Sequence, residues 1–193
     1  MQGARDIKGG VLGKYAKVAC SPAGLFRYPT GEESARRLRY PEALVAKVPA
    51  AIRERFVGVG NPFALGAIPE GAAVLDLGCG AGFDAFIAAG LVGPGGRVHG
   101  VDLSPEMLGI AEDGRRRGGL PQLRFQVADV EALPFGDGRF DVALSNGVLN
   151  LVPDKPAALR EIFRVLRPGG RLQACDMSLV ADAPPPDKAP WSD

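Results

Sequence analysis

The segment VLDLGCGAGFD, residues 74–84, combines residue types that could enclose a small ligand. Gly78, Gly80 and Gly82 stand at alternate positions after an apolar run that contains Asp76. Glycine adopts positive φ readily and lets a ligand approach the backbone, which a side chain would prevent. A tight turn after a buried strand would explain one such glycine, whereas three in alternation favour a binding loop.

This loop lacks the features of two common phosphate-binding motifs. A dinucleotide fingerprint has its last glycine at the sixth position, where this sequence has Phe83. A Walker loop has a lysine after its glycines, and none follows here. Asp76 and Asp84 lie beside the glycines and would repel a phosphate group. The loop therefore suits a ligand that carries positive charge or hydroxyl groups.

Two further acidic residues end the next two apolar runs. Asp102 follows the glycines by about 20 residues, where a carboxylate can accept hydrogen bonds from two ribose hydroxyls. An aspartate that caps the helix starting at Pro105 is the alternative interpretation. Asp129 closes the following run and could accept a hydrogen bond from an adenine amino group.

The elements that must position these residues follow from alternating patterns. Short apolar runs, several of them apolar on both faces, predict buried parallel strands. These runs lie at residues 73–77, 97–102, 123–127, 140–145 and 171–175. Helices are expected at residues 84–91, 105–117 and 155–166, the second capped by Ser104 and the third with a buried stripe of Leu159, Ile162, Phe163 and Leu166. Strand alternating with helix predicts a doubly wound α/β fold around a mostly parallel sheet.

The N-terminal region differs from the rest of the chain. Prolines punctuate three short helical patterns at residues 32–38, 41–47 and 49–56. Such short helices cannot form a core alone, so they should lie across another layer. We expect residues 1–66 to form a helical lid or extension, residues 67–180 the ligand-binding domain, and residues 181–193 a proline-rich tail.

Five motifs, in this order and spacing between residues 69 and 176, resemble the class I S-adenosylmethionine-dependent methyltransferases. They are VLDLGCGAGFD, VHGVDLSPEML, FQVADVEALPF, FDVALSNGVLNLVPDK and LRPGGRL. The resemblance implies S-adenosylmethionine as the cofactor and a sheet of strand order 3-2-1-4-5. The class usually adds two more strands after the fifth, for which the proline-rich tail offers no pattern, so a sheet of five strands is one expectation. The resemblance implies that the loop of Asp76, Gly78, Cys79, Gly80 and Gly82 faces the methionine part. It further implies ribose binding by Asp102, adenine contacts by Leu103, Met107, Asp129 and Val130, and a place beside the sulfonium for Asn146.

A finer likeness, to the arsenite methyltransferase branch, lies in YAKVACS and SNGVLNLVPDKPAALREIFRVLRPGG. Where that branch has an arsenic-binding cysteine after the asparagine, this sequence has Gly147. Trivalent arsenic is held by converging thiolates, so the likeness implies a small-molecule methyl acceptor but not a standard arsenite site. Cys20, Gly147 and Asn150 are the residues expected near the acceptor, an ordinary unpaired cysteine being the alternative for Cys20. Catalytic residues stay unnamed, because methyl transfer from a sulfonium requires alignment more than acid or base catalysis.

Two other functions compete with an active methyltransferase. One is a non-catalytic cofactor-binding or regulatory protein on the same fold, which Gly147 and the short C-terminus favour. The other is a nicotinamide-dependent oxidoreductase, which Phe83 disfavours. An intact set of Asp76, the three glycines and Asp102 favours the enzyme.

Composition limits the possible binding partners of the protein and its expected location in the cell. A net charge of +1 with interspersed signs gives no footprint for nucleic acid, and three widely spaced cysteines suit neither disulfides nor a metal site. The sequence has neither a signal peptide pattern nor an apolar run long enough for a membrane, which predicts a cytoplasmic protein. An uncovered edge on the fifth strand favours a homodimer.

Overall fold

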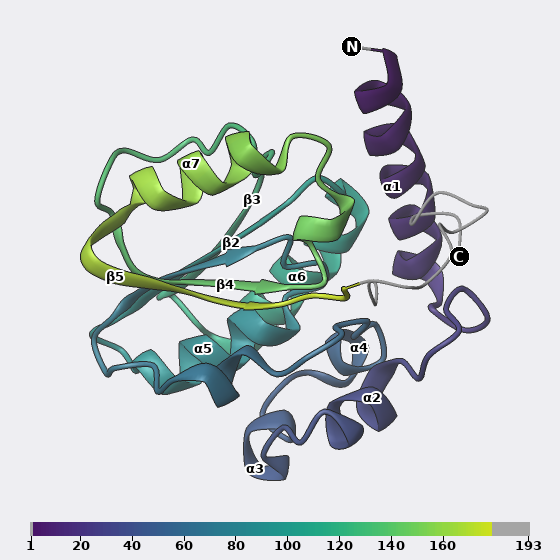
Figure 1. Cartoon of the computed structure of the whole chain (residues 1–193). Helices are drawn as coiled ribbons and strands as arrows, with labels where there is room; N and C mark the ends of the chain where they lie inside the picture. Colours follow the sequence, from purple (N-terminus) through teal and green to yellow (C-terminus); the bar gives the residue numbers. More distant parts are fainter. Residues whose placement is uncertain (1, 179–193) are drawn as a thin grey trace.

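The computed structural model describes residues 2–178, with side chains from residue 7 onward. Five parallel strands form one sheet in the order β3-β2-β1-β4-β5, flanked by helices (Figure 1). The strands are β1 (Ala73–Leu77), β2 (Arg97–Asp102), β3 (Leu123–Val127), β4 (Phe140–Asn146) and β5 (Leu166–Cys175). The predicted α/β class and strand order are therefore confirmed.

The fifth strand begins earlier than the sequence pattern indicates. Its pairing with β4 shifts register between Phe140 and Val142, so that residues 167–170 form an irregularity within the strand. Gly169 has φ of 80°, which a residue with a side chain rarely adopts. The segment RPGG, expected to be a connection, thus belongs to β5.

Helices cover both faces of the sheet. On one face lie α5 (Phe83–Val92) and α6 (Pro105–Gly118), and on the other lies α7 (Lys155–Val165) (Figure 1). Side chains of β1 alternate between the two cores, with Val74 packed on the α5 side and Leu75 on the α7 side. Ser104 caps α6 by accepting from the Met107 amide at 3.3 Å, as its sequence predicts.

The buried face of α7 differs from the expected stripe. Leu159 is 47% exposed and Phe163 is 83% exposed, whereas Ala158, Ile162 and Val165 are buried. Both sets have helical spacing, so periodicity alone cannot select between them. The small Ala158 side chain permits close approach of the helix to the sheet, and the larger residues are left outside.

The N-terminal region contains one α-helix and one 3-10 helix that the sequence pattern did not predict. The region comprises α1 (Gln2–Cys20), α2 (Gly31–Arg37), α3 (Glu42–Val45), α4 (Ala50–Arg53) and the 3-10 helix η1 (Pro62–Leu65). Glycines in α1 lower its intrinsic helix propensity, so its position depends on packing against α6 and a second 3-10 helix, η2 (Leu149–Leu151). The expected tail, residues 181–193, lies outside the described residues.

Edges and helix lengths bear on two other predictions. Among residues 2–178, β3 and β5 form the edges of the sheet, and no strand follows β5. Homodimerisation through the β5 edge stays a prediction. In the same range, none of the helices has the length and apolar character needed to cross a membrane.

The α7 packing predicts unequal effects of two adjacent substitutions. Ile162→Ala should lower the free energy of unfolding by about 2–4 kcal/mol, because it leaves a cavity against the sheet. Phe163→Ala should change it by less than about 0.5 kcal/mol, because the ring is exposed. Urea unfolding followed by circular dichroism measures both, and equal losses would contradict the observed helix face.

Candidate functional site

A pocket lies at the carboxyl ends of β1, β2 and β4, where neighbouring connections leave the sheet on opposite faces. Its wall combines the glycine loop, the starts of the segments after β2, β3 and β4, and parts of α1 and the segment after α4. The predicted residues that line it are Asp76, Gly78, Cys79, Gly80, Asp102, Leu103, Met107, Asp129, Val130, Asn146 and Gly147. The fold thus brings residues as far apart in sequence as Asp76 and Gly147 into one wall.

The glycine loop has the positive φ values that its sequence implies. Gly78, Gly80 and Gly82 have φ of 59°, 53° and 92°. A Cβ on Gly78 would lie 2.5 Å from a methyl group of Val148, so a larger residue would push apart the loop and the segment after β4. Gly82 does not line the pocket; it precedes α5, and a Cβ there would lie 2.8 Å from the ring of Phe125. Gly82 therefore supports the fold behind the pocket.

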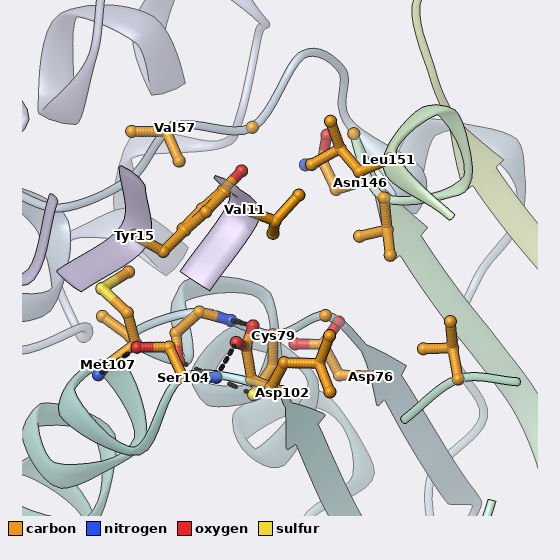
Figure 2. Close-up of a pocket in the computed structure, with 18 of the residues that line it drawn as sticks. Val11, Tyr15, Val57, Asp76, Cys79, Asp102, Ser104, Met107, Asn146 and Leu151 are labelled. Atoms are coloured by element: carbon orange, nitrogen blue, oxygen red, sulfur yellow. Dashed lines mark hydrogen bonds between the residues drawn. The ribbon is translucent and has the colours of Figure 1, made fainter. Parts of the chain in front are cut away.

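Asp102 connects three elements at the end of β2. Its Oδ2 accepts from the Gly80 amide and its Oδ1 from the Ser104 amide, each at 2.8 Å (Figure 2). Burial raises the pKa of this carboxyl, and the amide hydrogen bonds oppose that shift. Because Ser104 is itself the cap of α6, Asp102 is not the helix cap. It fixes the glycine loop relative to β2 and lines the pocket.

Buried negative charge dominates the electrostatics of the pocket. Asp76 is 2% exposed and its Oδ2 has no hydrogen-bond partner. Burial, and then the charge of Asp84, raises the pKa of Asp76 well above its ordinary value. Burial also raises the pKa of Asp84 to about 6 and keeps Cys79 a neutral thiol by raising its pKa. An unsatisfied carboxylate oxygen in this position favours a cationic ligand.

Helix α1 covers the pocket opposite the glycine loop. Figure 2 shows Val11 and Tyr15 facing Asp102 across the cavity. The Lys8 ammonium donates to the carboxylates of Asp129 and Glu131 and thereby ties α1 to the segment after β3. The spacing of Val11, Tyr15 and Val18 is the sequence signal that could have revealed this helix.

Two predicted acceptor residues lie away from the pocket lining. Cys20 is exposed at the end of α1. Asn150 instead contacts the residues just after β5. Its backbone N–H donates to Asp176 Oδ2 at 3.0 Å, and its side-chain nitrogen donates to the Met177 carbonyl. Cys79 is thus the one cysteine among the described residues that lines the pocket.

Comparison with known proteins agrees with this architecture. Residues 68–191 match a family described as a methyltransferase domain. The arsenite methyltransferase of Halobacterium salinarum is 42% identical over 158 residues, which cover 82% of this chain and 40% of that protein. The demethylmenaquinone methyltransferase of Lactococcus lactis is 41% identical over 108 residues, 56% of this chain and 43% of that protein. The crystal structure of an arsenic(III) S-adenosylmethionine methyltransferase from Chlamydomonas reinhardtii matches with a TM-score of 0.65 and 41% identity, covering 70% of this chain and 48% of that chain.

The chain belongs to the class I S-adenosylmethionine-dependent methyltransferases, a family whose cofactor is S-adenosylmethionine. The family that the sequence motifs resemble is therefore confirmed. These matches do not support the non-catalytic or the oxidoreductase interpretation. The chain spans about 40% of the length of the arsenite methyltransferases that it matches.

The unpartnered carboxyl of Asp76 predicts that Asp76→Asn stabilises the ligand-free fold. Because the pKa of Asp76 is raised in the folded state, this carboxyl lowers stability progressively as pH rises from its ordinary pKa towards the raised one, and the loss is recovered as pH falls again through that range. The melting temperature should rise at pH 8 by at least about 2–4 °C, the equivalent of 1 kcal/mol in a chain of this size. The gain should shrink at pH 5. Melting curves of Asp113→Asn, whose carboxylate is 59% exposed, provide the control, and a destabilised Asp76→Asn would contradict the prediction.

Proposed function

We propose that this chain transfers a methyl group from S-adenosylmethionine to a small-molecule acceptor with an apolar body. The observation that carries the proposal is the buried, unpartnered Oδ2 of Asp76 beside a loop of positive-φ glycines. The donor of this family is a cation, and among the described residues none donates a hydrogen bond to Asp76 Oδ2. The lack of a lysine after the glycines agrees with a ligand that has no phosphate.

In this proposal, different residues of the pocket bind different parts of the cofactor. Asp76 and the loop from Gly78 to Gly80 take the methionine part, with Asp76 accepting from its ammonium group. Asp102 retains acceptor capacity beyond its two amide bonds and takes the ribose hydroxyls. Leu103, Met107 and Val130 enclose the adenine, and the Asp129 carboxylate accepts from its amino group. The donor set therefore fits the cofactor.

When bound, S-adenosylmethionine supplies a methyl group activated by the sulfonium. The chain's own residues then have to hold the acceptor in line with that methyl group and exclude water. Tyr15 of α1 and Val57 form the cover that excludes water. A base is required only for an acceptor that loses a proton, which explains why the site needs no catalytic triad.

The acceptor side of the pocket is apolar. Val11, Val57 and Leu151 line it across the cavity from the acidic loop (Figure 2). At Gly147 a Cβ would meet the side chain of Val59 at 3.4 Å, so two apolar positions face each other where a metalloid would need thiolates. Among the described residues the lining offers a single cysteine, Cys79, and its thiol is protonated. An apolar acceptor is favoured over arsenite, as in the relative named for a demethylmenaquinone substrate.

Binding of S-adenosylhomocysteine tests the cofactor site directly. Isothermal titration of the full chain should give micromolar affinity, and Asp102→Ala should weaken it at least tenfold, about 1.4 kcal/mol. Asp102→Asn keeps an oxygen that can accept one amide bond and should fall between the two. If folded wild-type protein does not bind, or if Asp102→Ala binds equally well, the proposal fails.

The acidic pocket also predicts a pH dependence of cofactor affinity. Ionised Asp76 and Asp84 attract a cation, and both carboxyl pKa values are raised, that of Asp84 to about 6. Affinity for S-adenosylmethionine should therefore fall as pH decreases from 8 to 5. S-adenosylhomocysteine lacks the sulfonium charge and should lose less affinity over the same range. Parallel titrations measure the difference, and identical pH profiles for the two ligands would count against this electrostatic role.

The acceptor class is tested by turnover. The chain is incubated with S-adenosylmethionine and either a reduced naphthoquinone or arsenite with a thiol, and S-adenosylhomocysteine formation is followed. We expect the apolar acceptor to accelerate product formation and arsenite to have no effect, because one thiol cannot chelate arsenic. Acceleration by arsenite alone would overturn the proposed acceptor class while leaving the methyltransferase assignment intact.

A further inference from the structure

Asn146, the last residue of β4, is fully engaged by hydrogen bonds. Its side-chain oxygen accepts from the Val59 amide at 2.8 Å and from the Gly60 amide at 3.0 Å. Its nitrogen donates to the Gly60 carbonyl and to Asp84 Oδ2, both at 2.9 Å, and it also lies within hydrogen-bond distance, 3.1 Å, of the Tyr40 hydroxyl oxygen. Both N–H groups and both oxygen lone pairs are therefore used within the protein.

Asp84 accepts a second hydrogen bond from a different part of the chain. The Tyr40 hydroxyl donates to Asp84 Oδ1 at 2.7 Å, and both side chains are buried. The Tyr40 ring is itself fixed by edge contacts with the rings of Phe56 and Phe83. An ionised Asp84 thus links the N-terminal region, the start of α5 and the end of β4.

Residues 57–60, here called the strap, run between these groups and the pocket. Val57 and Gly58 line the pocket beside Asn146. The Val57 carbonyl accepts from the Tyr28 hydroxyl at 3.2 Å. The close approach requires glycine at position 60, since a Cβ there would lie 2.3 Å from Cβ of Cys175. The strap is therefore held from both sides.

We propose that Tyr40, Asp84 and Asn146 are positioning residues that hold the strap as the acceptor-side wall of the pocket, and that Asn146 acts through the strap and not by touching the cofactor. The inference rests on the proposed function, because a wall that positions an acceptor matters only if the chain transfers a methyl group to one. It departs from the role beside the sulfonium that the family resemblance implies for Asn146. The reason is that its amide has no free donor or acceptor left.

The network depends on the charge of Asp84. An ionised carboxylate accepts from both Tyr40 and Asn146, whereas a protonated one must donate in one direction. The Tyr40 hydroxyl can then donate to the Gly60 carbonyl, 3.0 Å away. Protonation of Asp84 therefore changes a hydrogen bond to the strap. The titratable groups that face Asp84 are Tyr40, Asp76 on β1 and Cys175 on β5.

Nuclear magnetic resonance titration of the full chain between pH 4.5 and 8 tests the inference. The carboxyl carbon of Asp84 should titrate near pH 6, and the amide signals of Val59 and Gly60 should share its midpoint. In Tyr40→Phe the ring packing stays but a hydrogen bond to the ionised carboxylate is lost. Because that bond lowers the Asp84 pKa, the shared midpoint should move to higher pH.

A matched control comes from Tyr28→Phe. It removes a hydroxyl bound to the same strap at the Val57 carbonyl but leaves Asp84 untouched, so the midpoint should not move. If the substitutions only made the strap more mobile, the midpoint would not move in Tyr40→Phe while staying unchanged in Tyr28→Phe. If the Val59 and Gly60 amides titrate independently of Asp84, or if both variants shift the midpoint equally, the network does not hold the strap as proposed.

Cofactor binding separates this inference from the proposed function. At pH 7, Tyr40→Phe should bind S-adenosylhomocysteine within about threefold of wild type. Asn146→Ala should also keep its affinity, in contrast to the tenfold loss expected for Asp102→Ala. A tenfold loss in Asn146→Ala would place Asn146 on the cofactor and overturn the inference. If wild type fails to bind, the proposed function fails, while the titration still decides the role of the network.

Discussion

Three carboxyl groups crowd into one buried corner at the ends of β1 and β2, and the surrounding structure is arranged around their mutual repulsion. Asp102 is compensated by the amides of Gly80 and Ser104, and Asp84 by Tyr40 and Asn146. Asp76 keeps one oxygen unpartnered. Two of the three charges are therefore satisfied within the protein, and the third is left for a ligand. A cation bound at this point would offset the free-energy cost of burying the unpartnered Asp76 carboxylate.

The pocket joins two walls that are built from different segments of the chain. The acidic loop and the strand ends carry the motifs that resemble other methyltransferases, and the proposed donor site lies there. The opposite wall comes from α1 and the strap, and there Gly147 faces Val59 with no thiol between them. A fold can retain its donor site while the facing wall changes the acceptor, because the two walls are built from separate segments.

The sequence predicted what local patterns determine. Short apolar runs located the five strands, and Ser104 followed by Pro105 located the start of α6. Patterns failed where tertiary contacts decide. Helix α1 was missed because its glycines weaken the local signal, and the exposed face of α7 was misassigned because two helical stripes overlap. The bond between Asn146 and Asp84 spans 62 positions, which no local motif reveals.

The contact between Lys8 and Asp129 has a consequence for the order of assembly. The two residues are 121 positions apart, and α1 leaves the ribosome well before Asp129 does. At typical synthesis rates α1 waits on the order of 10 s for its carboxylate partners, with a glycine-rich sequence that is a poor helix by itself. The strands between them can pair in that interval. Helix α1 is thus made before the elements on which it packs, and the pocket gains this cover only after β1, β2 and β3 have been synthesised.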